Sequence, residues 1–139
     1  MKLTKKYNGV NVDVDDDYLK IDTHSNDNTE DEILRVLSDH QTLKHLILHS
    51  VYISDKIAAA IIKLENLSTI KLVLSFFDSV AFLSEAKQLK TLWIDNLDDV
   101  ERIKDIGEIR QLKAVGCDGH SLYDLIEYLK IENLKKIHI

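Results

Sequence analysis

Apolar residues recur along this chain with one spacing. Four apolar positions are separated by two, then two, then one intervening residues, and equivalent positions in successive segments lie 22 to 24 residues apart. The last three residues of a segment, such as Leu46, Ile47 and Leu48, alternate inward, outward and inward as a strand requires. His40 is the only polar residue at these positions, which are His40, Leu43, Leu46 and Leu48; Leu64, Leu67, Ile70 and Leu72; Ala86, Leu89, Leu92 and Ile94; Ile109, Leu112, Val115 and Cys117; and Ile131, Leu134, Ile137 and Ile139.

Helix-like segments lie between these strands, and each follows a residue suited to an N-cap. The pairs of cap and segment are Ser54 with Asp55–Leu64, Asp78 with Ser79–Ala86, Asn96 or Asp98 with the stretch to Ile106, and Ser121 with Leu122–Lys130. A strand and a helix within so few residues leave little connecting chain, so each unit must stack on the next. We therefore predict an α/β solenoid with a curved parallel sheet on the concave side and helices on the convex side.

The first forty residues predict an N-terminal cap and a weaker repeat. Asn8-Gly9 suits a tight turn between two strands, so residues 1–15 are expected to form a β-hairpin that covers the end of the solenoid. Residues 16–39 are expected to form a degenerate first repeat, with a strand over Tyr18–Thr23 and a helix over Glu30–Asp39. Thr29 and Glu32 have the spacing of a capping box. Residues 40–139 then form five repeats of the same single domain.

The repeated stretch resembles the leucine-rich-repeat family, in its short-repeat class of roughly 22 residues. The matching stretches are Leu43–Leu48, Leu67–Leu72, Leu89–Ile94, Leu112–Cys117 and Leu134–Ile139. The family usually has Asn or Cys shortly after each strand, where the side chains link neighbouring turns. This chain has Val51, Ser75, Leu97 and His120 there, so we expect no such ladder and irregular turns.

Composition and charge narrow the classes of function. The chain has 139 residues, 45% of them hydrophobic and 30% charged, and a net charge of -6, which argues against non-specific nucleic-acid binding. A single cysteine permits no intramolecular disulfide and suits a reducing compartment. No secretory signal or apolar run of membrane-spanning length is present. We expect a cytoplasmic protein that binds neither membranes nor nucleic acids.

Three sets of residues could carry chemistry, and each has a simpler interpretation. Asp13, Asp15 and Asp17 have the spacing of a calcium loop, but its required Gly and Glu are absent, so a solvated acidic turn is expected. Cys117 takes an inward strand position and is expected to be core.

His45 and His49 share a strand face but stand roughly 13 Å apart, too far to chelate one ion alone. A metal or enzymatic site that combines them with Asp22 or Asp95 is the alternative to a binding function. No catalytic motif or phosphate-binding glycine loop is present, and we expect neither enzymatic activity nor a cofactor.

The outward strand residues form the preferred candidate site. Their central row is Lys20, Ile47, Lys71, Trp93, Gly116 and His138, flanked on one side by Tyr18, His45, Thr69, Thr91, Ala114 and Lys136 and on the other by Asp22, His49, Val73, Asp95 and Asp118. Trp93, Ile47, Val73 and Tyr18 are the expected anchors of a protein partner, with a rim of Lys71, His45, His49, Asp22, Asp95, Asp118 and His138. The other interpretation of Trp93 is a core residue covered by the hairpin or a loop.

The leading hypothesis is therefore a non-catalytic protein-interaction module. A narrower form of it is an inhibitor or immunity-type protein that neutralises a cognate toxin or enzyme, and a further alternative is a structural subunit of a larger assembly. The last strand also predicts an uncovered parallel edge, which would support a homodimer by strand addition.

Overall fold

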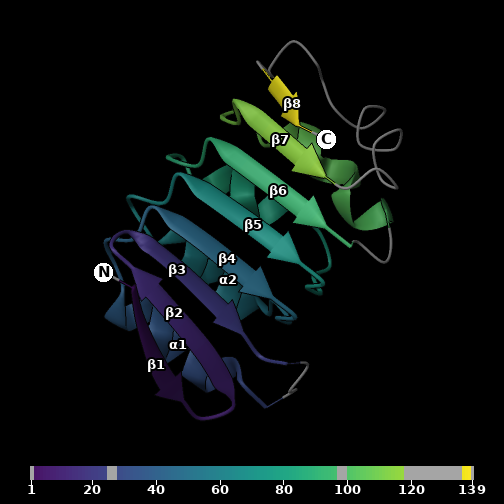
Figure 1. The fold of residues 1–139 in the computed structure, drawn as a ribbon. Helices are drawn as coiled ribbons and strands as arrows, with labels where there is room; N and C mark the ends of the chain where they lie inside the picture. The colour runs from purple at the N-terminus through teal and green to yellow at the C-terminus, as the bar shows by residue number, and fades with distance from the viewer. Residues whose placement is uncertain (1, 25–27, 97–99, 118–135, 139) are drawn as a thin grey trace.

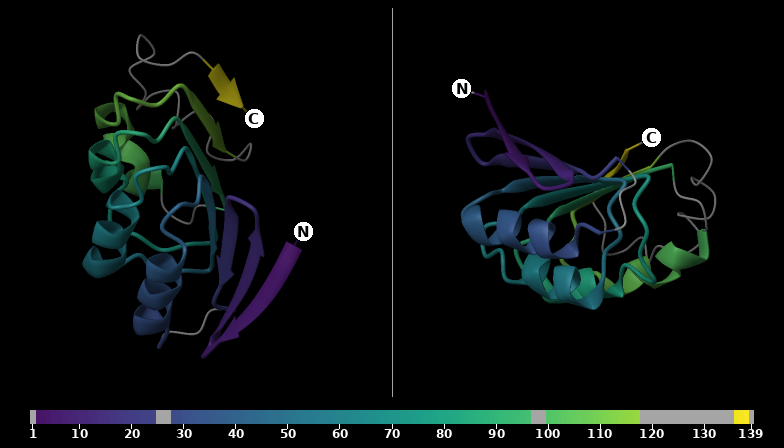
Figure 2. Two further views of the ribbon diagram at one scale, coloured as in Figure 1. Left: turned by 90° about the vertical axis from the view of Figure 1, so that its left-hand side faces the viewer. Right: turned by 90° about the horizontal axis from the view of Figure 1, so that it is seen from below.

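The computed structural model describes residues 2–24, 28–96, 100–117 and 136–138, with side chains described within 7–24, 28–96 and 101–117. The described residues form one open, eight-stranded sheet whose strands follow chain order. The helical segments all lie against one face of this sheet, as Figures 1 and 2 show. The predicted α/β class is confirmed, with a mostly parallel sheet. The strands are β1 (Lys2–Tyr7), β2 (Val10–Asp15), β3 (Tyr18–Asp22), β4 (His45–His49), β5 (Thr69–Val73), β6 (Thr91–Asp95), β7 (Ala114–Cys117) and β8 (Lys136–His138).

The helical segments become tighter along the chain. The first two are the α-helices α1 (Glu30–Asp39) and α2 (Asp55–Ile62), and the next two are the 3₁₀ helices η1 (Ala81–Glu85) and η2 (Val100–Glu108). Equivalent residues that begin β3 to β7 (Tyr18, His45, Thr69, Thr91 and Ala114) are 27, 24, 22 and 23 positions apart. A 3₁₀ helix rises about 2.0 Å per residue against 1.5 Å for an α-helix. The five residues of η1 thus return the chain to the sheet in the shortest repeat, and the sequence pattern did not predict the change to 3₁₀ helices.

The N-terminal hairpin is present and continues the sheet. β1 and β2 pair antiparallel, with Tyr7 opposite Val10 and Gly9 in the left-handed region at φ 79°. β2 then pairs antiparallel with β3, and all later pairs are parallel. The expected acidic turn is wrong in part, because Asp13 and Asp15 belong to β2, opposite Lys20 and Tyr18.

The repeated apolar spacing has a direct structural basis. The first two positions of each row flank a tight turn. In this turn the backbone N–H of Leu43 donates to the carbonyl of His40 at 3.4 Å, and the same bond recurs from Leu67 to Leu64 at 3.1 Å. The second half of the row is the strand, with inward Leu46 and Leu48 fully buried. The predicted inward phase is confirmed for every apolar position of the first four rows, from Leu43 to Cys117.

A left-handed residue follows three successive parallel strands. Ser50, Leu74 and Asn96 have φ values of 57°, 50° and 55°, and they come directly after residues paired across the sheet. Glycine and asparagine are the residues that adopt this conformation most readily. Asn96 fits this preference, whereas Ser50 and Leu74 do not, so the backbone is strained at Ser50 and at Leu74.

Hydroxyl groups link neighbouring turns at two places, which corrects the expectation that turn-linking side chains are absent. The buried Ser75 Oγ donates to the carbonyl of Leu48 at 2.9 Å and accepts from the Val51 N–H at 3.2 Å. The buried Thr23 Oγ1 donates to the carbonyl of Ser50 in the same way. Serine and threonine hydroxyls thus bridge neighbouring turns at these two places.

The two α-helices begin where predicted, but only one cap is as expected. Ser54 Oγ accepts from the Ile57 N–H at 3.3 Å and caps α2. Thr29 makes no side-chain cap hydrogen bond, so the predicted capping box is wrong. Glu32 Oε2 accepts instead from the Asn8 N–H at 3.2 Å and joins α1 to the hairpin turn.

Much of the predicted last repeat falls outside the described residues. The expected helix over 122–130 and positions 131 and 134 of the last row lie outside the described residues, while Ile137 belongs to β8 and pairs with Val115. No helix in the described ranges has the length and apolar character needed to cross a bilayer.

Candidate partner-binding face

The face of the sheet opposite the helices carries the outward strand residues, and we call it the open face (Figure 2). The parallel register aligns Lys20, Ile47, Lys71, Trp93 and Gly116 in one row, as predicted. His138 continues the row by its backbone pairing with Gly116, but its side chain lies outside the description. Asp118, expected in a flanking row, also lies outside the described residues.

Trp93 is partly exposed on the open face and rests on the adjacent strand. A Cβ atom built onto Gly116, its partner in β7, would come within 2.0 Å of the indole Cε3 and 2.4 Å of Cζ3. The ring therefore covers the Cα of Gly116, at a place where only glycine leaves room. On the other side, the Lys71 ammonium lies 5.6 Å from the indole centroid, within cation–π range.

The N-terminal hairpin does not cover Trp93, so of the two covers in the alternative interpretation, hairpin or loop, the hairpin is wrong. Sheet order places β1 and β2 beside β3, with β4 and β5 between β3 and the strand of Trp93. Figure 1 shows the hairpin at one edge of the sheet, with β6 far from it. The indole is thus flanked by Lys71 and Gly116 of its two neighbouring strands and keeps part of its surface open.

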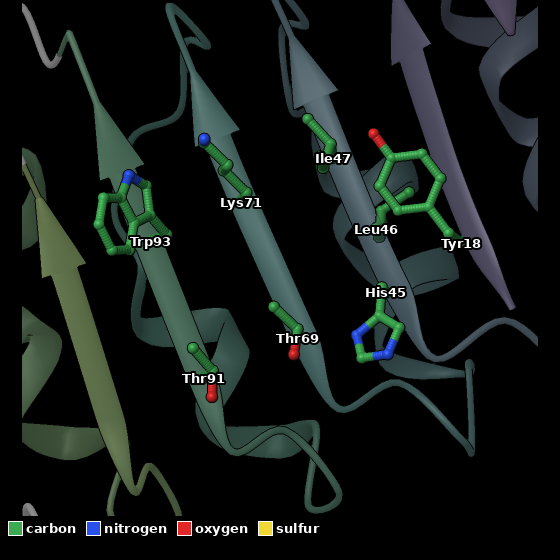
Figure 3. Close-up of a pocket in the computed structure, with 8 residues that line it drawn as sticks. All are labelled: Tyr18, His45, Leu46, Ile47, Thr69, Lys71, Thr91 and Trp93. Atoms are coloured by element: carbon green, nitrogen blue, oxygen red, sulfur yellow. The ribbon is translucent and has the colours of Figure 1, made fainter. Parts of the chain in front are cut away.

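A hollow of about 280 Å³ opens beside Trp93, and Figure 3 shows the side chains around it. Tyr18 and Trp93 lie at its two ends, and the short side chains of Thr69 and Thr91 line its base. An apolar cavity of roughly 150 Å³ is enough to hold benzene, so this hollow has room for a large side chain. Its lining is Tyr18, His45, Leu46, Ile47, Thr69, Lys71, Thr91 and Trp93.

Tyr18 has a perturbed phenol at the other end of the hollow. Burial raises the pKa of Tyr18 above its usual value, and the charges of Asp13 and Asp15 raise it further. Both carboxylates belong to the neighbouring strand β2. The phenol therefore stays protonated through neutral pH and remains a hydrogen-bond donor and acceptor for a bound group.

The flanking row at the carboxyl ends of the strands holds two close pairs of a basic and an acidic side chain. His49 Nδ1 lies 3.4 Å from Asp22 Oδ2, and Lys71 Nζ lies 3.6 Å from Asp95 Oδ2. Val73 stands between these pairs, partly exposed, and does not line the hollow. Of the four predicted anchors, the structure thus brings together Tyr18, Ile47 and Trp93 around one hollow, with Val73 beside it.

The histidines and acids of the alternative metal hypothesis are not gathered at one point. His49 faces Asp22, which also lies 3.7 Å from His24, whereas Asp95 faces Lys71. His45 belongs to the rim of the hollow instead. The described residues contain no group of three or more His, Cys, Asp and Glu side chains placed to hold a metal ion. Cys117 is buried at 2% exposure, as its inward position predicted.

One apolar surface of the structure was not predicted from the sequence. Tyr52, Leu74 and Phe76 are exposed large hydrophobic residues on the turns that follow β4 and β5. Alternation continues past the strand ends, with Val51, Ile53, Ser75 and Phe77 buried, and this alternation was the available signal.

Comparison with known proteins adds no relative to this picture. No protein-family model matches the chain, and no curated protein matches it.

Proposed function

We propose that this chain is a non-catalytic protein-binding module whose open face takes up a segment of a partner protein in the hollow between Tyr18 and Trp93. The observation that carries the proposal is a partly exposed tryptophan beside an apolar hollow, on a sheet face that none of the described helices covers. Tryptophan and tyrosine are the residues most enriched at the energetic centres of protein interfaces.

We also propose that the fold is a solenoid of the leucine-rich-repeat type. Three regularities support this: parallel strands in chain order, the recurring turn at each row of leucines, and the left-handed residue after β4, β5 and β6. In such solenoids the sheet face is a common binding surface. The single thiol is buried and requires no oxidising environment, and we place the protein in the cytoplasm as part of the same proposal.

The dimensions of the hollow favour one partner helix. Tyr18 belongs to β3 and Trp93 to β6, so their two strands lie three spacings of about 4.8 Å, or about 14 Å, apart across the sheet. An α-helix with side chains is about 10–12 Å wide. A single helix laid along the strands would therefore fit between the rings and place an apolar side chain over Thr69.

The expected contribution to partner affinity is largest for Trp93. Truncation of a central tryptophan at an interface typically costs about 2–4 kcal/mol, so Trp93→Ala should weaken partner binding by roughly 30-fold or more. The rim pairs, such as Lys71 with Asp95, are partly exposed and should contribute well under about 1 kcal/mol each.

Photo-cross-linking from two positions tests the proposal. The probe is p-benzoylphenylalanine, placed at Thr69 on the floor of the hollow or, as the control, at exposed Lys104 on η2. We expect a cross-link to one discrete protein from position 69 alone. The purified partner should then shift the emission of the sole tryptophan, because Trp93 borders the hollow.

A matched pair of variants guards against misfolding. Trp93→Ala should abolish the cross-link from position 69 without loss of the folded circular dichroism spectrum, while Lys104→Ala should leave it intact. Equal cross-linking from positions 69 and 104, or a complex that leaves Trp93 emission unchanged, would refute binding through this face.

A further inference from the structure

The large exposed hydrophobic residues of the described chain gather on the turns at the carboxyl ends of β4 and β5. Tyr52, Leu74 and Phe76 are 61%, 45% and 45% exposed, and these three are the exposed large hydrophobic residues in the described part of the protein. They lie on consecutive turns, after β4 and after β5. We call this set the turn patch. Contiguous exposed apolar surface with a polar rim is typical of interaction sites.

The exposure is imposed by the backbone. Tyr52 and Phe76 form a parallel bridge, fixed by hydrogen bonds from the Ile53 N–H to the Phe76 carbonyl at 2.8 Å and from the Phe76 N–H to the Val51 carbonyl at 2.9 Å. Neighbours in such a pair stand about 4.8 Å apart. The buried side chain of Ser75 holds the same two turns together. The rings of Tyr52 and Phe76 therefore lie side by side on a backbone that these hydrogen bonds hold in place.

A second hollow of about 290 Å³ adjoins Tyr52 and is acidic. Glu30, Asp55 and Asp78 line it against a single basic residue, Lys56. No ion pair joins any of these three carboxylates to another described residue. The first turns of α1 and α2 supply Glu30 and Asp55, so the helix dipoles offset part of this charge, while Asp78 lies outside both helices.

We propose that the turn patch and this acidic hollow form a second docking surface, and that its occupant is a basic protein segment in which arginine alternates with apolar residues. The guanidinium fits here better than an ammonium, because it stacks on an aromatic face and pairs with a carboxylate through two hydrogen bonds at once. It would lie on Tyr52 and pair with Asp78, while the next apolar side chain covers Phe76 and Leu74. The chain's net charge of -6 favours approach of such a segment and repels anionic surfaces such as nucleic acid.

This surface is separate from the open face. Its aromatic residues follow the strands, whereas Tyr18 and Trp93 lie within them. The two proposals rest on different residues and can fail independently.

The test is a titration of isotope-labelled protein with capped synthetic peptides, followed by amide chemical shifts. The probe is acetyl-Arg-Leu-Arg-Leu-Arg-Leu-amide. Two matched controls remove one feature each: one replaces leucine with serine, and the other replaces arginine with glutamine. We expect the probe to shift the amide signals of residues 51–56 and 74–79. Each control peptide should bind at least about threefold more weakly, because it lacks interactions equivalent to one exposed cation–π contact.

Protein variants complete the experiment. Tyr52→Ser and Asp78→Asn should each weaken the probe by at least about threefold. Glu65→Gln, an exposed carboxylate away from the patch, should leave binding unchanged. Tyr52 and Asp78 are both exposed, so the two substitutions should change thermal unfolding little, and a loss of binding would not reflect misfolding.

Three results would overturn the proposal: equal binding of the serine control, shifts confined to the open face, or no shifts at millimolar peptide. Concentration-dependent dimerisation that Phe76→Ser abolishes would also overturn it, because the occupant would then be a second copy.

Discussion

Gly116→Ala should destabilise the fold, because the added methyl group would collide with the ring of Trp93. The added methyl carbon would stand 2.0 Å, 2.4 Å and 2.7 Å from three atoms of the Trp93 ring. Carbon atoms in contact normally lie about 3.5–4.0 Å apart, so the indole must move by more than about 1 Å. Its other neighbour in the row, Lys71, lies 5.6 Å from the ring centre, which leaves an outward movement into solvent as the available path.

The free energy of unfolding should show opposite signs in two backgrounds. With Trp93 present, overpacking of this kind typically costs about 1–3 kcal/mol. In a Trp93→Ala background the obstacle is gone, and replacing glycine in a strand should stabilise by roughly 0.5–1 kcal/mol. The double-mutant cycle should therefore give a coupling energy of roughly 1.5–4 kcal/mol between positions 93 and 116.

Urea unfolding followed by far-ultraviolet circular dichroism measures all four proteins, including those without tryptophan. In Gly116→Ala alone, the emission of Trp93 should also shift to the red as the ring leaves β7. A coupling energy near zero, with the same effect of Gly116→Ala in both backgrounds, would contradict the placement of the indole over β7.

Other predictions follow from the turns and the hairpin. Leu74→Asn should stabilise the fold by about 1 kcal/mol in urea unfolding, because Leu74 is exposed and holds a left-handed φ of 50°; a loss of stability would refute the strain. Ser75→Ala should cost about 1–3 kcal/mol, since it leaves the buried Val51 N–H and Leu48 carbonyl short of a partner; a neutral result would contradict the bridge. Burial and a hydrogen bond to Asp39 raise the pKa of Tyr7 above 10, so its proton is held more tightly in the folded state. Its stabilising contribution should be complete below pH 10 and disappear at higher pH, and Tyr7→Phe should flatten that part of the stability profile.

The strands and their inward phase could be predicted because both depend on local periodicity. Alternation across Leu46, Ile47 and Leu48 decides which side chain is buried whatever lies next to the strand. The cap at Ser54 is equally local, since its acceptor and donor are three residues apart. Trp93 could be assigned to the outward row for the same reason.

Features that depend on distant residues could not be predicted. The capping box failed because Glu32 meets the Asn8 N–H, 24 positions earlier in the chain. The change from the α-helices α1 and α2 to the 3₁₀ helices η1 and η2 has no counterpart in the apolar spacing. The turn patch had a signal in the alternation that continues past β4 and β5, but the left-handed Ser50 and Leu74 lack the glycine or asparagine that normally marks such a turn.

The proposed function requires that Trp93 is partly open to solvent in the free protein and covered by a partner in the complex. Acrylamide quenching of its fluorescence tests this directly, because the chain has one tryptophan. We predict substantial quenching of the free protein and a several-fold smaller quenching constant in the complex with the partner that cross-links from position 69. A free protein that resists quenching as a fully enclosed indole does, or a complex quenched as readily as the free protein, would contradict the claim.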